Sequence, residues 1–207
     1  MLPLQLAVNP EGWRAFARRR EDRAFLPVSE RVFTRDEYIC QYCGFQARQH
    51  QQIVNADGNY ASNKLANLVT ACCFCSQCLF IESVGLDEIG GGQLISMPEM
   101  SQADLNSFCH VLFCAMGNGT GYQDVAESIY RDMKFRSQPV ESRFGAGTSQ
   151  PAVLGQLIQE YRVQNAEFDV GTMLAGMCLL PSHTKFRIQL DAWAADALEE
   201  IAAQEQP

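Results

Sequence analysis

The chain has 207 residues, of which 47% are apolar and 19% are charged, so it is long enough to bury an ordinary hydrophobic core. It contains no run of eighteen apolar residues, and its N-terminus lacks the charged start, long apolar run and small-residue cleavage site of a signal peptide. These features exclude a transmembrane or exported protein in favour of a soluble, cytosolic one, and we expect no direct membrane insertion.

The formal net charge of −8 is concentrated in the later part of the chain. Residues 1–50 carry eight Lys/Arg against six Asp/Glu, whereas residues 51–207 carry eight against eighteen. A nucleic-acid-binding protein gains much of its affinity by neutralising phosphates. The acidic balance therefore argues against nucleic acid as a partner.

A basic cluster near the N-terminus is the exception to this balance. Arg18–Arg20, with Arg14 and Arg23 nearby, fall on an expected short helix. Such a cluster is usually a solvated face or a protein contact, and phosphate binding is the alternative.

Two pairs of cysteines follow, each with C-x-x-C spacing, and 28 residues separate Cys43 from Cys72. A C-x-x-C pair can grip a metal ion from a tight turn, and Gly44 after the second sulfur favours that turn. Two pairs complete a tetrahedral site with no open position, which favours one structural Zn²⁺ over a catalytic one. Redox or disulfide chemistry is the alternative, although the odd count of nine cysteines excludes full pairing. The expected metal ligands are Cys40, Cys43, Cys72 and Cys75.

Between the first cysteine pair and residue 100, the sequence lacks helical periodicity. A polar stretch over Asn55–Asn63 predicts a loop, and the glycine run Gly90–Gly92 precedes an apolar stretch, Gln93–Met97, that predicts a strand ending at Pro98.

After residue 100 the pattern becomes helical. Ser101 and Asp104 resemble a capping box, and apolar residues then recur with helical spacing until Gly117. Further helical stripes are expected to bury their apolar residues; they run over Tyr122–Met133, Val153–Tyr161 and Phe186–Ile201.

Two other segments of this half have different patterns. Val170–Leu180 is apolar enough to be buried, although Gly171 and Gly176 weaken it as a helix, and Pro181 ends it. The Ser/Gly/Gln-rich stretch Ser137–Gln150 is predicted to be a mobile loop.

The segment around the cysteines resembles the HNH endonuclease module. In the zinc-containing members of that family, two strands and a helix are pinned by four cysteines, which map here onto the two pairs named above. The resemblance also selects Cys72 with Cys75 over the competing pair Cys75 and Cys78, which leaves Cys73 and Cys78 as free thiols. The matching strings are RDEYICQYCG at residues 35–44, HQQIVN at 50–55 and NLVTACCFCS at 67–76.

This module implies an α+β fold, in which a small zinc-bound ββα (HNH-like) module at about residues 33–82 is combined with a predominantly α-helical C-terminal half. We expect an N-terminal region over 1–99 and a helical region over 100–207, packed together as one compact unit. Of the remaining cysteines, Cys109, Cys114 and Cys178 are expected to be small core residues.

The same resemblance indicates that catalysis is lost. Gln52 stands where HNH nucleases have the histidine base, and Ser76 stands where they have an Asn or His that holds the catalytic ion, so only Asn67 is retained. His50 would lie on the same side as Gln52 in a strand and could replace the base. An HNH-type nuclease and a zinc-stabilised nucleic-acid-binding protein therefore remain the alternatives. His110 and His183 have no ligand-spaced partners and are assigned no role.

The whole chain resembles the DotN/IcmJ family of type IVB secretion systems. The resemblance rests on the first HNH-like string, on the phrase GQLISMPEMSQ at residues 92–102, and on the helical second half. It implies a cytoplasmic adaptor that binds the C-terminal tail of the inner-membrane coupling ATPase and other coupling-complex subunits. Such an adaptor would be peripheral to the inner membrane through its partner and would help to recruit effector proteins.

Overall fold

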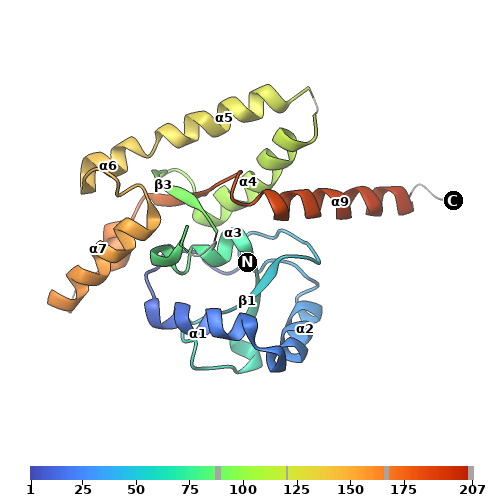
Figure 1. Cartoon of the computed structure of the whole chain (residues 1–207), viewed down its shortest axis with the longest axis horizontal. Coiled ribbons are helices and arrows are strands. Elements are labelled where there is room, and N and C mark those ends of the chain that lie inside the picture. Colours follow the sequence, from blue (N-terminus) through green and yellow to red (C-terminus); the bar gives the residue numbers. More distant parts are fainter. Residues whose placement is uncertain (87–89, 120, 166–167, 205–207) are drawn as a thin grey trace.

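The computed structural model describes residues 1–86, 90–119, 121–165 and 168–204. Over these residues helices predominate, and two antiparallel sheets of two strands each accompany them, so the predicted α+β class is confirmed. Helices α1 and α2 lie at one end of the molecule and α5 at the other, with α3, β3 and α4 between them (Figure 1).

The N-terminal helices begin after a short extended segment. Helix α1 (Pro10–Glu21) has proline at its first position, and the Asn9 side chain accepts a hydrogen bond from Gly12 N at 3.0 Å, which caps the helix. The 3₁₀ turn η1 (Arg23–Phe25) and helix α2 (Leu26–Arg35) follow. The helix expected for the basic cluster is therefore present.

Two strands and a short helix surround the second cysteine pair. Strand β1 (Gln51–Asn55) pairs antiparallel with β2 (Leu68–Cys72), the 3₁₀ turn η2 (Leu65–Asn67) precedes β2, and helix α3 (Cys73–Gln77) follows it directly. The predicted polar loop lies between the strands. The Asn55 amide closes this loop by donating to Asn59 O at 2.9 Å and Ser62 O at 2.7 Å.

The second sheet joins two segments that are far apart in the sequence. Strand β3 (Gly92–Ser96) lies one residue earlier than the predicted strand and pairs antiparallel with β4 (Met177–Pro181). The apolar segment that ends at Pro181 divides into helix α8 (Val170–Leu174) and β4, and its predicted burial is confirmed only for β4, because Leu174 is the one buried residue of α8. Gly176 adopts φ +73°, which lets the chain turn between them.

The predicted helical stripes form four long helices. Helix α4 (Gln102–Gly117) begins where the capping residue Ser101 accepts a hydrogen bond from Asp104 N at 3.1 Å. The others are α5 (Gln123–Phe135), α7 (Pro151–Gln164) and α9 (Arg187–Gln204). The 3₁₀ turn η3 (Ile81–Ser83) packs against α7.

The stripes are buried only in part, so the prediction that all their apolar residues are core is wrong. On α5, Ala126 and Met133 are buried, whereas Val125 and the capping residue Tyr122 are exposed. Leu198 on α9 is also exposed. Helical periodicity identifies an apolar face, but it does not show whether another element of the same chain covers that face.

The predicted mobile loop over Ser137–Gln150 is also wrong. Its first half is helix α6 (Gln138–Phe144), in which Val140 is only 2% exposed. Its second half is tied to β3, because Leu94 N donates to Ser149 O at 2.7 Å. Serine and glycine therefore occur here in turns that are hydrogen-bonded to the sheet.

One hydrophobic cluster includes residues from both sides of residue 100, among them Phe16, Cys72, Leu105 and Trp193. The expected burial of Cys109 and Cys178 is confirmed. The expectation for Cys114 is wrong, because that residue is exposed near the end of α4. Within the described residues, no helix has the length and apolar character required to cross a membrane.

Candidate metal centre

The structure brings the four predicted ligands together. The Sγ atoms lie within 4.8 Å of one another, and all four residues are buried; they are Cys40, Cys43, Cys72 and Cys75. The closest hydrogen-bonded pair, Cys43 Sγ and Cys72 Sγ, is separated by 3.6 Å. The first cysteine pair comes from a turn before β1, and the second from the junction of β2 with α3.

Backbone hydrogen bonds shape the turn that carries the first pair. Gly44 adopts φ +78°, and its N–H donates to Cys40 O at 2.9 Å. Cys40 N in turn donates to Phe45 O at 2.8 Å. Gln41 N donates to Thr70 O at 2.9 Å, which fixes the turn against β2. This arrangement brings the two cysteine pairs together in one cluster.

The electrostatics of the cluster favour a bound cation. Hydrogen bonds from the other three thiols lower the pKa of Cys40, whereas burial raises the pKa values of Cys72 and Cys75. The Cys40 thiolate is thus stabilised by hydrogen bonds from the neighbouring thiols, whereas burial disfavours ionisation of Cys72 and Cys75. Since metal ligands must be deprotonated, a cation is required to hold all four as thiolates. The cluster could hold a metal ion, and four sulfur ligands are consistent with zinc.

Two side chains of α4 contact the cluster from outside. Asn106 Nδ2 donates to Cys75 Sγ at 3.3 Å, and His110 Nε2 lies 3.4 Å from Cys72 Sγ. The His110 ring stacks on Phe45 with centroids 3.6 Å apart, and burial lowers its pKa to about 3, so the ring is neutral. Such contacts orient ligands and tune a metal site.

These two contacts were missed by the sequence analysis, which assigned no role to His110. The available signal was the spacing of four between Asn106 and His110, which places two polar residues on one face of an apolar helix. Their partners are more than thirty positions earlier in the chain, and that distance hid the contact.

We expect Asn106→Leu to weaken metal binding by roughly 10- to 100-fold, because it removes a donor to a ligand sulfur. Competition with a chromophoric chelator measures the affinity. Asn118→Leu is the matched control, because the Asn118 amide donates to the exposed Cys114 sulfur at 3.0 Å, outside the cluster. Equal weakening by both variants would contradict this role for Asn106.

The other cysteines of this segment lie outside the cluster. The Cys78 thiol is buried and donates to Phe74 O at 3.2 Å. Cys73 is half-buried and lines a neighbouring cleft.

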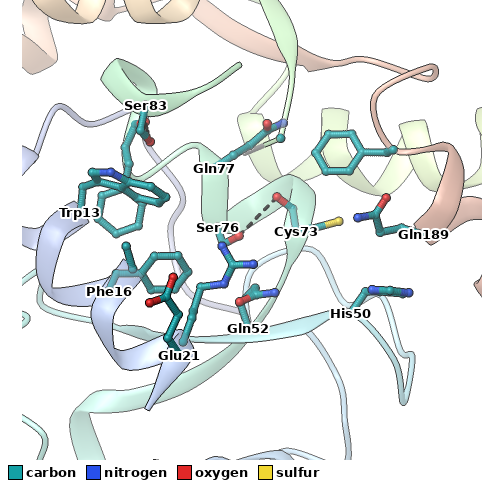
Figure 2. Close-up of a pocket in the computed structure, with 15 residues that line it drawn as sticks. Trp13, Phe16, Glu21, His50, Gln52, Cys73, Ser76, Gln77, Ser83 and Gln189 are labelled. Carbon is teal, nitrogen blue, oxygen red and sulfur yellow. Dashed lines mark hydrogen bonds between the residues drawn. The ribbon is translucent and has the colours of Figure 1, made fainter. Parts of the chain in front are cut away.

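This cleft has a volume of about 460 Å³, and Cys73, the residue after the expected ligand Cys72, is among the lining residues that Figure 2 shows. Gln52 from β1 and Ser76 from α3, the two positions where the HNH resemblance expects catalytic groups, both line it. Ser76 Oγ donates to Cys73 O at 3.3 Å. The opposite wall includes Trp13 and Phe16 of α1. The cleft therefore lies between the cysteine segment and α1.

His50 also lines the cleft, but it precedes β1 and adopts φ +60°, so it does not lie in the strand as the base replacement assumed. Gln52 has no proton that titrates near neutral pH. The Gln77 Nε2 donor is buried at the wall without a partner in the described part of the chain. Asn67 organises the preceding loop instead, by accepting from Asp57 N at 3.1 Å. The cleft can offer hydrogen bonds from amides, a hydroxyl and an imidazole, and its lining also includes the charged side chains of Arg20 and Glu21.

The basic cluster divides into one structural residue and several exposed ones. Arg19 donates to Ile53 O and Asn55 Oδ1, both at 2.7 Å, and its guanidinium lies 4.8 Å from the centre of the Phe25 ring. Arg19 therefore attaches α1 to β1. The exposed members are Arg14, Arg18, Arg20 and Arg23.

Fold and site together define an α+β protein with a closed, buried four-cysteine cluster that could hold one metal ion. No family model matches the sequence. The type 4 apparatus protein DotN of Legionella pneumophila is 54% identical over 199 residues, which cover 96% of this chain and 92% of that protein. The chain belongs to the DotN family.

Proposed function

We propose that this chain is a non-catalytic, zinc-containing adaptor subunit of a type IVB secretion coupling complex. It binds the C-terminal tail of the coupling ATPase and other subunits of the complex, and helps to recruit effector proteins. It is cytoplasmic and is held at the inner membrane through its partner. The observation that carries the proposal is the extensive identity with a type 4 apparatus protein in a chain that also has a closed, buried cysteine cluster.

In this proposal the cluster binds one structural Zn²⁺ through Cys40, Cys43, Cys72 and Cys75. The module at about residues 33–82 derives from the HNH fold. The order of β1, β2 and α3 around the cysteines supports this origin. The region 1–99 packs on the region 100–207 as one compact unit, as the shared hydrophobic cluster supports.

The adaptor is non-catalytic because its cleft lacks the expected base. Gln52 cannot accept the proton that HNH chemistry removes from water. One observation favours the alternative of an HNH-type nuclease or a zinc-stabilised nucleic-acid-binding protein: His50 lines the same cleft as Gln52 and Ser76, close to a helix with exposed arginines.

Calorimetric titration of the zinc-loaded protein with the isolated C-terminal tail of the coupling ATPase tests the adaptor role. We expect binding with a Kd below tens of micromolar, or more than about 6 kcal/mol of binding free energy. The heat-capacity change should be negative, because ordering a tail segment buries apolar surface. Absence of heat at tens of micromolar, with correctly folded protein, would contradict the adaptor role.

A nuclease assay tests the alternative. We expect no cleavage of DNA or RNA with magnesium, manganese or zinc, because Gln52 replaces the base and Ser76 replaces an ion ligand. His50→Ala is the decisive control. Cleavage by the native protein that disappears in this variant would overturn the non-catalytic assignment in favour of a nuclease with a displaced base.

A further inference from the structure

A second and larger cavity, of about 1270 Å³, shares no lining residue with the first cleft. It is bounded by α9, by the C-terminal half of α4 and by the turn that follows the first cysteine pair. We refer to it as the α9 groove. Its apolar lining includes Phe45, Phe113, Leu190, Trp193, Leu198 and Ile201.

The distal half of α9 lines the groove with apolar side chains that are exposed to solvent. The helix extends away from the rest of the molecule toward the C-terminus (Figure 1). Leu198 is 68% exposed and Ile201 is 53% exposed, although both line the groove. Trp193, nearer the body, is only 9% exposed. The groove is thus closed at one end and leaves apolar side chains open to water at the other.

The dimensions and walls of the groove fit a segment of polypeptide. Small-molecule sites usually occupy about 300–1,000 Å³, and this groove is larger. Its two long walls are helices, and a groove between helices is suited to the apolar face of a third helix.

Charge identifies the kind of segment. Four carboxylates and two guanidiniums line the groove, so the negative groups are in excess. Arg187 is already paired with Asp191 at 2.9 Å. Glu199 and Glu200 are exposed on the distal half of α9, next to the open apolar residues. A second copy of α9 would bring like charges together, whereas a helix with basic residues beside its apolar stripe would complement them.

We propose that the α9 groove binds an amphipathic α-helix of a partner protein whose apolar stripe is flanked by Lys or Arg. The inference rests on the proposed function, since it assigns a surface and a chemistry to the partner that an adaptor requires. Leu198 and Ile201 contact the apolar stripe, and Glu199 and Glu200 contact the basic flank.

The metal centre supports the floor of this groove. Phe45 directly follows the cysteine turn and stacks on His110, which contacts Cys72 Sγ. Trp193 Nε1 donates to Gln49 O at 3.1 Å, which attaches α9 to the loop after that turn. We therefore expect loss of the metal to disturb the groove, although no ligand cysteine lines it.

Two synthetic helical peptides of about 18 residues, labelled with a fluorophore, provide the probe. Both carry the same Leu/Ala stripe, and one is flanked by Lys and the other by Glu. Fluorescence anisotropy at low salt should give a Kd below about 100 µM for the Lys peptide and at least about tenfold weaker binding for the Glu peptide.

Variants then locate the site. Leu198→Ser with Ile201→Ser should weaken binding of the Lys peptide by at least about tenfold. Val163→Ser on α7 is the matched control, because Val163 is an 88% exposed apolar residue outside the groove. Glu199→Lys with Glu200→Lys should reverse the preference toward the Glu peptide, and Glu160→Lys on α7 should leave it unchanged. Circular dichroism confirms that each variant is folded.

Several results would overturn the inference. Equal binding of the two peptides would exclude the charge complementarity, and equal weakening by the Val163 control would exclude the groove. A dimer at micromolar concentration that the Leu198/Ile201 variant disrupts would make a second copy the occupant. If the ATPase tail binds equally well to the native protein and to the groove variants, the groove inference fails and the adaptor role stands. If the groove binds the Lys peptide but the ATPase tail does not bind, the adaptor role fails.

Discussion

Replacement of Cys40 or Cys75 by serine is expected to abolish metal binding and to lower the free energy of unfolding by more than about 4 kcal/mol, in the range of the largest single-residue effects. Both sulfurs are fully buried in the hydrophobic cluster that includes residues from both halves of the chain. The three remaining ligands cannot close a tetrahedral site, and the new hydroxyl is buried without the metal. The loss should therefore extend beyond the module around the cysteines, to the packing of α4 and α9.

The measurements are zinc content by mass spectrometry and urea denaturation with and without a chelator. We expect one zinc per chain in the native protein and none in either variant. Cys78→Ser is the matched control, because Cys78 is equally buried and close in sequence but lies outside the cluster. Its hydroxyl can still donate to Phe74 O, as the thiol does. Equal zinc loss from Cys78→Ser would show that the ligand set has been assigned in the wrong register.

The part of the site that the sequence predicts well is the part determined by local spacing. A C-x-x-C pair and its glycine fix a turn within five residues, and the HNH resemblance implies the two strands beside the cysteines, which are β1 and β2. The cysteines named from the sequence therefore lie together in the structure. Helices α4 and α9 could be predicted for the same reason, since each has a long helical apolar period.

The contacts that the sequence did not reveal are those between distant segments. Asn106 and His110 contact the cysteines because α4 packs against α3, which directly follows β2. Helix α6 was not predicted because its polar composition is typical of a loop, and its packing against β3, with Val140 buried and Phe144 partly buried, is a contact between distant segments. Leu198 is exposed because no other element of the described residues covers it. A periodic pattern predicts the helix, but it does not show whether another element covers its apolar face.

The metal centre and the α9 groove share one set of packed side chains. Phe74 lies in the sequence between Cys72 of β2 and Cys75 of α3, its ring stacks on His110, and both rings lie against Trp193. We therefore expect a change at the metal to affect α9 through these aromatic contacts. Chelation of the metal should weaken peptide binding in the groove, whereas a substitution on the open face of α9 should leave zinc content unchanged.

Gly155→Ala on α7 is expected to destabilise the protein by about 2–3 kcal/mol, the upper part of the range for overpacking a core. An added Cβ would lie 2.5 Å from the Cα of Glu82 in η3, and 2.8 Å from its backbone nitrogen. Backbone atoms cannot rotate away as a side chain can, so α7 must move outward. This outweighs the gain of up to about 1 kcal/mol in helix propensity.

The movement of α7 would also disturb the N-terminal segment, because Asn9 N donates to the Glu82 carboxylate at 3.1 Å and Arg162 on α7 donates to Val8 O at 3.3 Å. Scanning calorimetry should show a melting temperature lower by roughly 4–12 °C. Gly117→Ala is the control, since Gly117 is also helical and no heavy atom of the described residues lies within 4 Å of its added Cβ. The control should be neutral or slightly stabilising, because only helix propensity changes there. A stabilising effect of Gly155→Ala equal to that of the control would show that α7 does not pack closely on η3 in solution.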